Sequence, residues 1–138
     1  MTKEEKQILL NDLKCRLYTK TQCQCMWSNT AKNGSVGVVN ELDTYILDEL
    51  ERIDNPDNED VISDIEPMFS DIKPYLRPLS TMAIEEKREY EKTFEMFDLL
   101  YLKTWKTYVW LNEHYFDYRG LIKLGLALEA PEGMYNVK

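Results

Sequence analysis

His114 is the single histidine of the chain, and it lies among polar side chains that could take part in catalysis. A histidine that acts as a general base needs a carboxylate to orient it, and either Glu113 or Asp117 offers one. Arg119 follows closely, and its guanidinium group suits a phosphate or a carboxylate. One hypothesis is therefore a small hydrolase or nucleotide-binding enzyme that uses His114 and Arg119.

A structural interpretation of the same residues competes with this hypothesis. Asp117 can cap a helix that follows it, and Arg119 can pair with acidic side chains elsewhere in the chain. The sequence contains no P-loop, no GxGxxG fingerprint, no HExxH motif and no nucleophile elbow. We therefore assign no catalytic residue and no cofactor, and we favour a protein that is not an enzyme.

The acidic residues concentrate in one stretch, 41–66. This stretch contains eleven acidic residues and one basic residue, Arg52, so its net charge is −10, against −8 for the whole chain. Direct nucleic-acid binding is not expected, because it requires a basic surface that displaces counterions from phosphates. A basic protein partner is compatible with the stretch, and so is a solvated acidic loop that keeps the protein soluble.

We predict a non-catalytic protein-interaction module that contacts its partner through this acidic stretch. The candidate partner-binding residues are Asp54, Asp57, Glu59, Asp60, Asp64, Tyr118 and Arg119. Exposed aromatic residues around Trp105, Trp110 and Tyr118 are a second candidate surface. A more specific alternative is a nucleic-acid mimic, in which carboxylates spaced like phosphates occupy the basic groove of a host nuclease or repressor.

The three cysteines, Cys15, Cys23 and Cys25, fit a reducing compartment, because an odd number leaves one thiol outside any disulfide. No further cysteine or histidine pair stands at zinc-binding spacing, so we predict no metal site. The N-terminal residues are charged where a signal peptide is apolar, and no apolar run is long enough to span a bilayer. These features predict a cytoplasmic protein that does not bind membranes, and they leave its oligomeric state open.

The elements that would position these residues begin with a helix. Thr2 and Glu5 have the spacing of a capping box, and apolar residues recur at helical intervals up to an expected end near Leu17. An alternating segment, TQCQCMWS, then predicts a strand with Cys23, Cys25 and Trp27 on one face. Asn33-Gly34 is a strong hairpin-turn signal, and SVGVVN would be the returning strand.

The middle of the chain is harder to interpret. Apolar residues of 42–53 repeat at helical spacing, which favours a helix there. Pro56 and its neighbours predict a turn. Prolines at 67, 74 and 78 predict an extended or edge-strand segment after it, with Ile72, Tyr75 and Leu79 as buried anchors.

From Met82 to Phe116 the composition favours helix, either one long helix or two that meet near Leu102, with Ser80 or Thr81 as the cap. An aromatic and apolar stripe along this region is expected to be core. Its members are Tyr90, Phe94, Phe97, Leu100, Tyr101, Trp105, Tyr108, Val109 and Leu111.

The C-terminal residues predict a short capped helix. Asp117 would cap YRGLIKLG, with Gly120 inside the helix and Gly125 as the residue that ends it. Leu121, Ile122 and Leu124 would face inward. LALEA is then expected to be extended, and PEGM to form a turn.

Together these segments predict an α+β fold. We expect a single small domain over 1–138, with an N-terminal helix, a small antiparallel sheet and a C-terminal helical portion. Residues 1–79 would contain the first helix and the β-rich part, and residues 80–138 the helical part.

Two segments also carry a resemblance. KPYLRPLSTM at 73–82 and HYFDYRGLIKLGLALEAPEGMY at 114–135 resemble a family of short proteins from gut Bacteroidetes, their phages and their mobile elements. The likeness covers 73–135 well and the first 20 residues loosely. It implies a phage or mobile-element origin, the cytoplasm of a bacterial host, and a strand rather than a helix at 43–53. It carries over no catalytic residue, and Ala83 stands where the family usually has a capping threonine.

Overall fold

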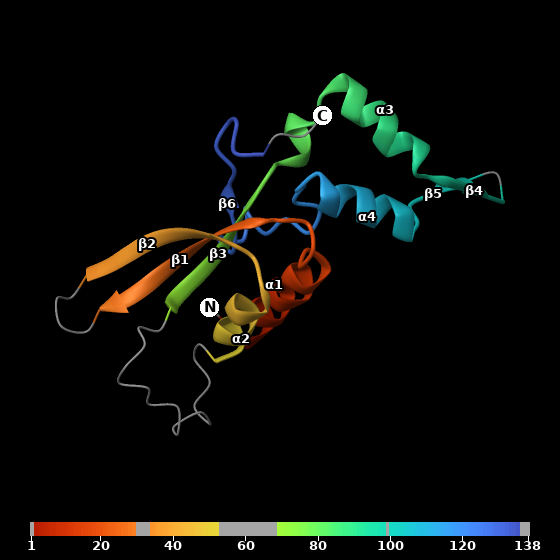
Figure 1. The fold of residues 1–138 in the computed structure, drawn as a ribbon. Helices are drawn as coiled ribbons and strands as arrows, with labels where there is room; N and C mark the ends of the chain where they lie inside the picture. The colour runs from red at the N-terminus through yellow and green to blue at the C-terminus, as the bar shows by residue number, and fades with distance from the viewer. Residues whose placement is uncertain (1, 30–33, 53–68, 99, 136–138) are drawn as a thin grey trace. The chain divides into compact units, whose positions relative to one another are not determined.

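The computed structural model describes residues 2–29, 34–52, 69–98 and 100–135 (Figure 1). They belong to two compact units, Met1–Tyr75 and Leu76–Lys138, which are described separately. Helices and short strands occur in both units, which confirms the predicted α+β class. The single-domain prediction stays a prediction.

Helix α1, Lys3–Cys15, opens the first unit as predicted. The Thr2 hydroxyl accepts a hydrogen bond from the Glu5 backbone N–H at 3.0 Å, which satisfies one of the free amides of the first turn. The buried apolar face includes Leu9, Leu10 and Leu13. The helix ends two residues earlier than expected, at Cys15.

Strands β1, Gln22–Asn29, and β2, Gly34–Glu41, form the predicted antiparallel hairpin, with Asn29 opposite Gly34. Asn33 and the turn it was predicted to form lie outside the described residues. Cys23 and Cys25 are buried on one face of β1, and the alternate residues Gln24 and Met26 are half-buried. The placement of the Trp27 side chain on the same face stays a prediction, because that side chain is not among those described.

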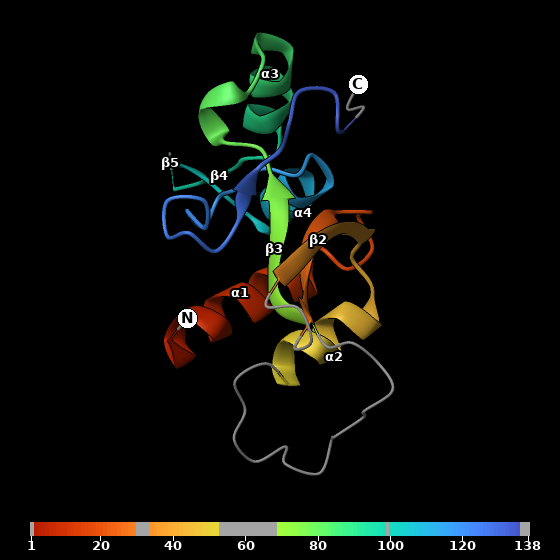
Figure 2. The ribbon, with the colours of Figure 1, turned by 90° about the vertical axis from the view of Figure 1, so that its left-hand side faces the viewer.

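Helix α2, Thr44–Arg52, shows that the strand implied by the resemblance at 43–53 is wrong. Its apolar residues repeat at helical spacing, and Ile46, Leu47 and Leu50 are buried. The Asp43 carboxylate accepts a hydrogen bond from the Ile46 N–H at 2.9 Å at the start of the helix. Helices α1 and α2 pack together within the first unit (Figure 2), where Lys6 donates to the Glu51 carbonyl at 2.7 Å. The helical spacing of the apolar residues therefore predicted this element correctly, and the resemblance did not.

Strand β3, Phe69–Leu76, pairs antiparallel with β1, so the strands of the first unit lie in the order β2-β1-β3. The predicted extended segment is confirmed from residue 69 on. Ile72 is fully buried and Tyr75 half-buried, whereas Leu79 is 41% exposed and is not an anchor. The turn predicted at Pro56 lies outside the described residues.

The second unit begins where β3 ends. A short 3-10 helix, η1 (Leu79–Thr81), leads into helix α3, Ile84–Lys92. The predicted caps Ser80 and Thr81 belong to the 3-10 turn, where the Thr81 hydroxyl donates to the Pro78 carbonyl at 2.6 Å. Instead the Glu86 carboxylate accepts the Ala83 N–H at 3.0 Å and so closes the first turn of α3.

Two helices, not one, follow η1, and a small hairpin separates them. Strands β4, Glu95–Phe97, and β5, Leu100–Leu102, pair antiparallel before helix α4, Trp105–Glu113. Neither strand was predicted. Three threonines close the base of the hairpin: the Thr107 hydroxyl accepts from the Thr104 N–H at 3.1 Å and from the Thr93 hydroxyl at 3.0 Å.

The C-terminal segment caps itself through Asp117, as predicted. Its carboxylate accepts the N–H groups of Leu121 at 2.8 Å and Ile122 at 3.0 Å. The segment 121–125 forms hydrogen-bonded turns rather than a helix, and Gly120 precedes these turns with φ +75° instead of lying inside a helix. Gly125 ends them with φ +77°, as expected of a terminating glycine.

Of the three residues expected to face inward there, only Leu121 is buried; Ile122 is half-buried and Leu124 is 52% exposed. Strand β6, Leu128–Glu129, confirms an extended run after Gly125. The Ala130 N–H bonds to the carbonyl of Leu76, the last residue of β3, at 2.8 Å. The predicted turn at 131–134 is also present, closed by the Met134 N–H on the Pro131 carbonyl at 3.1 Å.

Candidate functional site

His114 ends helix α4 and is held by aromatic and backbone contacts. Its Nδ1 atom lies 2.8 Å from the Trp110 carbonyl oxygen, and its ring stacks on the Trp110 ring at 4.0 Å. Its Nε2 atom is 3.9 Å from a carboxylate oxygen of Glu89. Asp117 uses both carboxylate oxygens on the N–H groups of the turns that follow it. Each residue is thus engaged at the end or start of an element, and Asp117 does not orient the imidazole.

Arg77, which the sequence did not single out, organises this region of the second unit. Its guanidinium group forms a two-pronged ion pair with Glu86, with both N···O distances 2.8 Å, and donates to the His114 carbonyl at 3.1 Å. The group also lies 4.2 Å from the centre of the Phe116 ring. Arg77 holds the pKa of Glu86 below its usual range through these hydrogen bonds.

The backbone of Arg77 is fixed as well. Its N–H donates to the Tyr115 carbonyl at 2.7 Å, and its carbonyl accepts the Asp117 N–H at 2.8 Å. These two backbone bonds make an isolated parallel β-bridge between Arg77 and Phe116. The one signal in the sequence was the position of Arg77 inside KPYLRP, the segment that carries the family resemblance.

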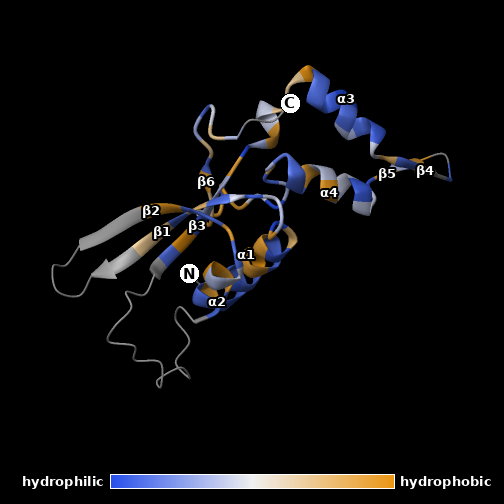
Figure 3. Cartoon of the chain, viewed as in Figure 1, coloured by the Kyte–Doolittle hydropathy of each residue, from blue (hydrophilic) through white to orange (hydrophobic). Residues whose placement is uncertain are grey.

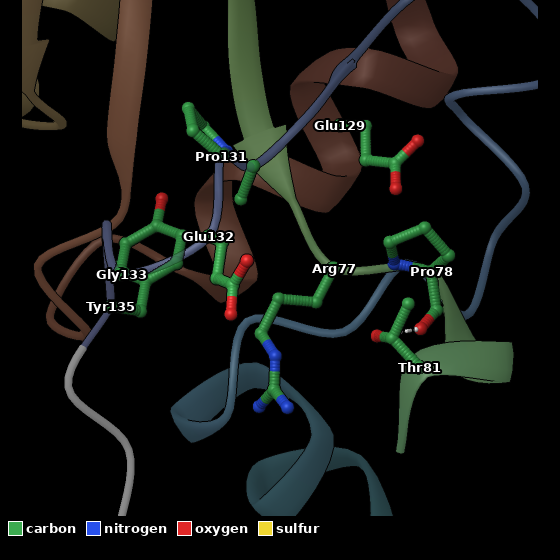
Figure 4. Close-up of a pocket in the computed structure, with 9 residues that line it drawn as sticks. Arg77, Pro78, Thr81, Glu129, Pro131, Glu132, Gly133 and Tyr135 are labelled. Atoms are coloured by element: carbon green, nitrogen blue, oxygen red, sulfur yellow. Dashed lines mark hydrogen bonds between the residues drawn. The ribbon is translucent and has the colours of Figure 1, made fainter.

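A pocket of about 420 Å³ lies against Arg77 (Figure 4). Two chain segments line it, 77–81 and 129–135, and they bring Glu129 and Glu132 to the same space as Arg77. Tyr135 contributes an aromatic wall. Its ring stacks on Tyr115 with the ring centres 3.7 Å apart, and Tyr115 has φ +64°, a conformation that is rare for an aromatic residue.

The second feature is a group of exposed apolar residues on β4, β5 and α4, which we call the hairpin–helix surface. Figure 3 colours these elements by the hydropathy of their residues. Trp105 is 71% exposed, Tyr101 66% and Leu100 63%. Met96 is paired with Tyr101 across the hairpin. The surface comprises Met96, Leu100, Tyr101, Leu102, Trp105, Tyr108 and Val109, all exposed.

The prediction that this stripe is core is therefore wrong for most of its members. Leu111 is buried and Tyr90 and Phe94 are half-buried, but five of the predicted core residues belong to the exposed surface: Leu100, Tyr101, Trp105, Tyr108 and Val109. The side chain of Phe97 lies outside the described part. Leu100 and Tyr101 lie on the β4–β5 hairpin rather than on a helix, and Trp105, Tyr108 and Val109 lie on an exposed side of α4.

The predicted partner-binding residues fall into two groups. Asp54, Asp57, Glu59, Asp60 and Asp64 lie outside the described residues. Tyr118 is half-buried, and its hydroxyl donates to Asn112 at 2.9 Å. Its ring lies 5.4 Å from that of Tyr108, and the exposed Arg119 guanidinium lies 5.3 Å from the same Tyr118 ring. The structure therefore brings Tyr118 and Arg119 to the α4 side of the hairpin–helix surface.

The cysteines differ in their exposure. Burial raises the pKa of the Cys23 and Cys25 thiols, so both are protonated at neutral pH. Cys15 is exposed. Across the described ranges no three or more His, Cys, Asp or Glu side chains gather as a metal site would require.

None of the helices in the described part of the chain combines the length and the apolar character of a membrane span.

Comparison of the chain with family models, with curated proteins and with solved structures finds no match. The resemblance carried by 73–82 and 114–135 therefore stays a prediction, and so do the bacterial host and the phage or mobile-element origin that it implies.

Proposed function

We propose that this protein is a non-catalytic protein-interaction module that binds its partner through the hairpin–helix surface. The observation that carries the proposal is the exposure of large aromatic and aliphatic side chains on β4, β5 and the first turns of α4. Surface apolar residues are common singly, but a group of them on adjacent elements is typical of an interface.

The composition of the surface supports this proposal. Trp105, Tyr101 and Tyr108 are of the residue types that dominate binding energy, because they bury a large area while they lose few rotamers. Their backbone is held in place by the threonine bonds at the base of the hairpin. A surface that is fixed before binding loses less conformational entropy when the partner arrives.

The partner that fits is a protein with an apolar face and basic surroundings. The apolar face would cover the hairpin–helix surface. The chain carries a net charge of −8 and the 41–66 stretch alone carries −10, and this negative charge would attract a basic protein over a long range. The acidic residues 54–64 thus add to the rate of association in this proposal and are not needed for the contact itself.

The experiment begins with capture of the partner on the immobilised protein and identification of the captured protein. The purified partner is then titrated against wild type and against Tyr101→Ala/Trp105→Ala. We expect the double variant to bind roughly 30-fold more weakly or worse, as for residues that dominate an interface. Tyr18→Ala is the matched control, because Tyr18 is 93% exposed but belongs to the other unit.

Three outcomes would contradict the proposal. Unchanged affinity of the double variant would remove the hairpin–helix surface from the contact. Loss of binding on neutralisation of Asp54, Asp57, Glu59, Asp60 and Asp64 alone would instead favour the nucleic-acid mimic. Concentration-dependent sedimentation that Trp105→Ala abolishes would mean that the surface binds a second copy of this chain.

The enzymatic alternative has its own test, which uses His114 and Arg119. If His114→Ala and Arg119→Ala leave partner binding intact but remove a cellular phenotype, catalysis would replace binding as the function. We expect neither substitution alone to change a phenotype unless it also changes the affinity for the partner.

A further inference from the structure

The pocket beside Arg77 is separate from the hairpin–helix surface, and its chemistry selects a ligand. We propose that it binds a cationic group, the guanidinium or alkylammonium end of a side chain that the partner protein inserts. The assignment of this group to a protein partner rests on the proposed function. The preference of the pocket for a cation rests on its own residues.

The charge of the pocket comes from its two glutamates. Arg77 lines the pocket, but its positive charge is matched by Glu86, which it contacts through two N···O distances of 2.8 Å. Glu129 and Glu132 are exposed acidic residues that line the same pocket. Two carboxylates therefore line the pocket, whereas the positive charge of Arg77, the basic residue among its lining residues, is matched by Glu86.

An anion is disfavoured by the charges around Arg77. Two N–H groups of its guanidinium are bonded to Glu86 and a third to the His114 carbonyl. The ion pair is mostly withdrawn from solvent, with side-chain exposures of 20% and 17%. A phosphate or a carboxylate that reached the remaining N–H groups would meet an arginine whose charge Glu86 already balances, and it would lie in a pocket that Glu129 and Glu132 also line.

The shape of the pocket suits one extended side chain. Its volume of about 420 Å³ is within the usual range of sites for small ligands. Pro78 and Pro131 give two of its walls a fixed backbone angle. Tyr135, held by its stack on Tyr115, offers a ring to which a guanidinium or ammonium group is attracted.

The test uses two peptides that differ in charge but not in shape. The full-length, ¹⁵N-labelled protein is titrated with acetyl-Gly-Arg-Gly-amide and with the same peptide in which citrulline replaces arginine. We expect the arginine peptide to shift the backbone amide signals of 77–81 and 129–135, with an affinity in roughly the millimolar range for one side chain. The citrulline peptide should shift them little.

Two double variants each remove two glutamate charges, one pair in the pocket and one pair on helix α3. Glu129→Gln/Glu132→Gln should weaken binding of the arginine peptide about tenfold or more, since both carboxylates lose their charge. Glu85→Gln/Glu91→Gln removes two exposed glutamates from α3 and should leave the affinity unchanged. Equal binding of the two peptides, or equal affinity of the two double variants, would overturn the proposal.

The purified partner separates this inference from the proposed function. If Tyr101→Ala/Trp105→Ala weakens partner binding and Glu129→Gln/Glu132→Gln does not, the proposed function stands and the pocket has no part in it. If acetyl-arginine-amide binds as tightly as the partner does, the pocket binds a free small cation. The proposal that the partner inserts a side chain into it would then be overturned. If both double variants weaken partner binding, both proposals are supported.

Discussion

The buried carboxylate of Asp117 caps the turns that follow it by accepting hydrogen bonds from two backbone N–H groups. It is 8% exposed and satisfies the N–H groups of Leu121 and Ile122. Asp117→Ala would leave both groups without this acceptor in a mostly buried place. We expect it to lower the free energy of unfolding by about 2–3 kcal/mol, measured by urea denaturation.

Asp117→Asn retains one oxygen acceptor and should fall between wild type and alanine. Glu113→Gln is the control, because Glu113 is exposed and its change should be within about 0.5 kcal/mol. Equal stability of Asp117→Ala and wild type would show that the cap contributes nothing.

Glu86 predicts how stability depends on pH. Arg77 lowers the pKa of Glu86 in the folded protein, so the ionised carboxylate stabilises the fold fully above the ordinary glutamate pKa of about 4.3. This stabilisation is lost as the pH falls through the lower, folded-state value. The stability difference between wild type and Glu86→Gln should therefore be about 1–2 kcal/mol at pH 7 and shrink below about pH 4.

Urea denaturation of both proteins at several pH values measures this difference. Glu91→Gln, at an exposed position on the same helix, provides the baseline. A difference between wild type and Glu86→Gln that stays constant from neutral to acidic pH would mean that the Arg77 ion pair does not set the pKa of Glu86.

Helix α2 shows what a periodic pattern can predict. Leu50 is fully buried in the first unit, whereas Tyr45 on the same helix is 46% exposed. We expect Leu50→Ala to cost about 2–5 kcal/mol, because it leaves a cavity between packed side chains. Tyr45→Ala should cost less than about 1 kcal/mol. Denaturation curves of the two variants test this contrast, and similar costs would contradict the observed orientation of α2.

Helix α1, the β1–β2 hairpin and α2 could be predicted because each has a local signal. Thr2 caps α1 through its own side chain, and the apolar residues of α2 repeat every three or four positions. The β4–β5 hairpin has no such signal, since its residues also fit a helical stripe. One contact at the base of the hairpin, the hydrogen bond of Thr93 to Thr107, joins residues fourteen positions apart. A local window does not contain that contact.

The candidate site was harder to predict for the same reason. Arg77 meets Glu86, His114 and the 129–135 segment only once the chain has folded. The sequence does supply the residue types, and it correctly indicated Asp117 as a cap and 131–134 as a turn. The sequence indicated His114 because it is the single histidine of the chain. It gave no comparable signal for Arg77, which lies between Pro74 and Pro78 and donates to the His114 carbonyl.

The two units divide the charge of the molecule unequally. The first unit contains fifteen acidic and eight basic residues, and the second contains ten and nine, so their net charges are −7 and −1. In our proposals the first unit therefore provides long-range attraction for a basic partner. The nearly neutral second unit provides the apolar surface and the pocket. Each role can be tested in its own unit.

All three cysteines belong to the first unit, and two of them, Cys23 and Cys25, are fully buried on β1. Native-state alkylation with iodoacetamide should modify the exposed Cys15 quickly. Cys23 and Cys25 should react at least about 100-fold more slowly, because their sheet must open first.

Mass spectrometry of the alkylated peptides would follow the three thiols in one experiment. Leu50→Ala should speed the reaction of Cys23 and Cys25 without changing that of Cys15, whereas equally fast alkylation of all three would contradict their burial. The reaction rate of Cys23 and Cys25 thus reports how often the first unit opens, and the reaction rate of Cys15 reports the activity of the reagent. The experiment needs no added label.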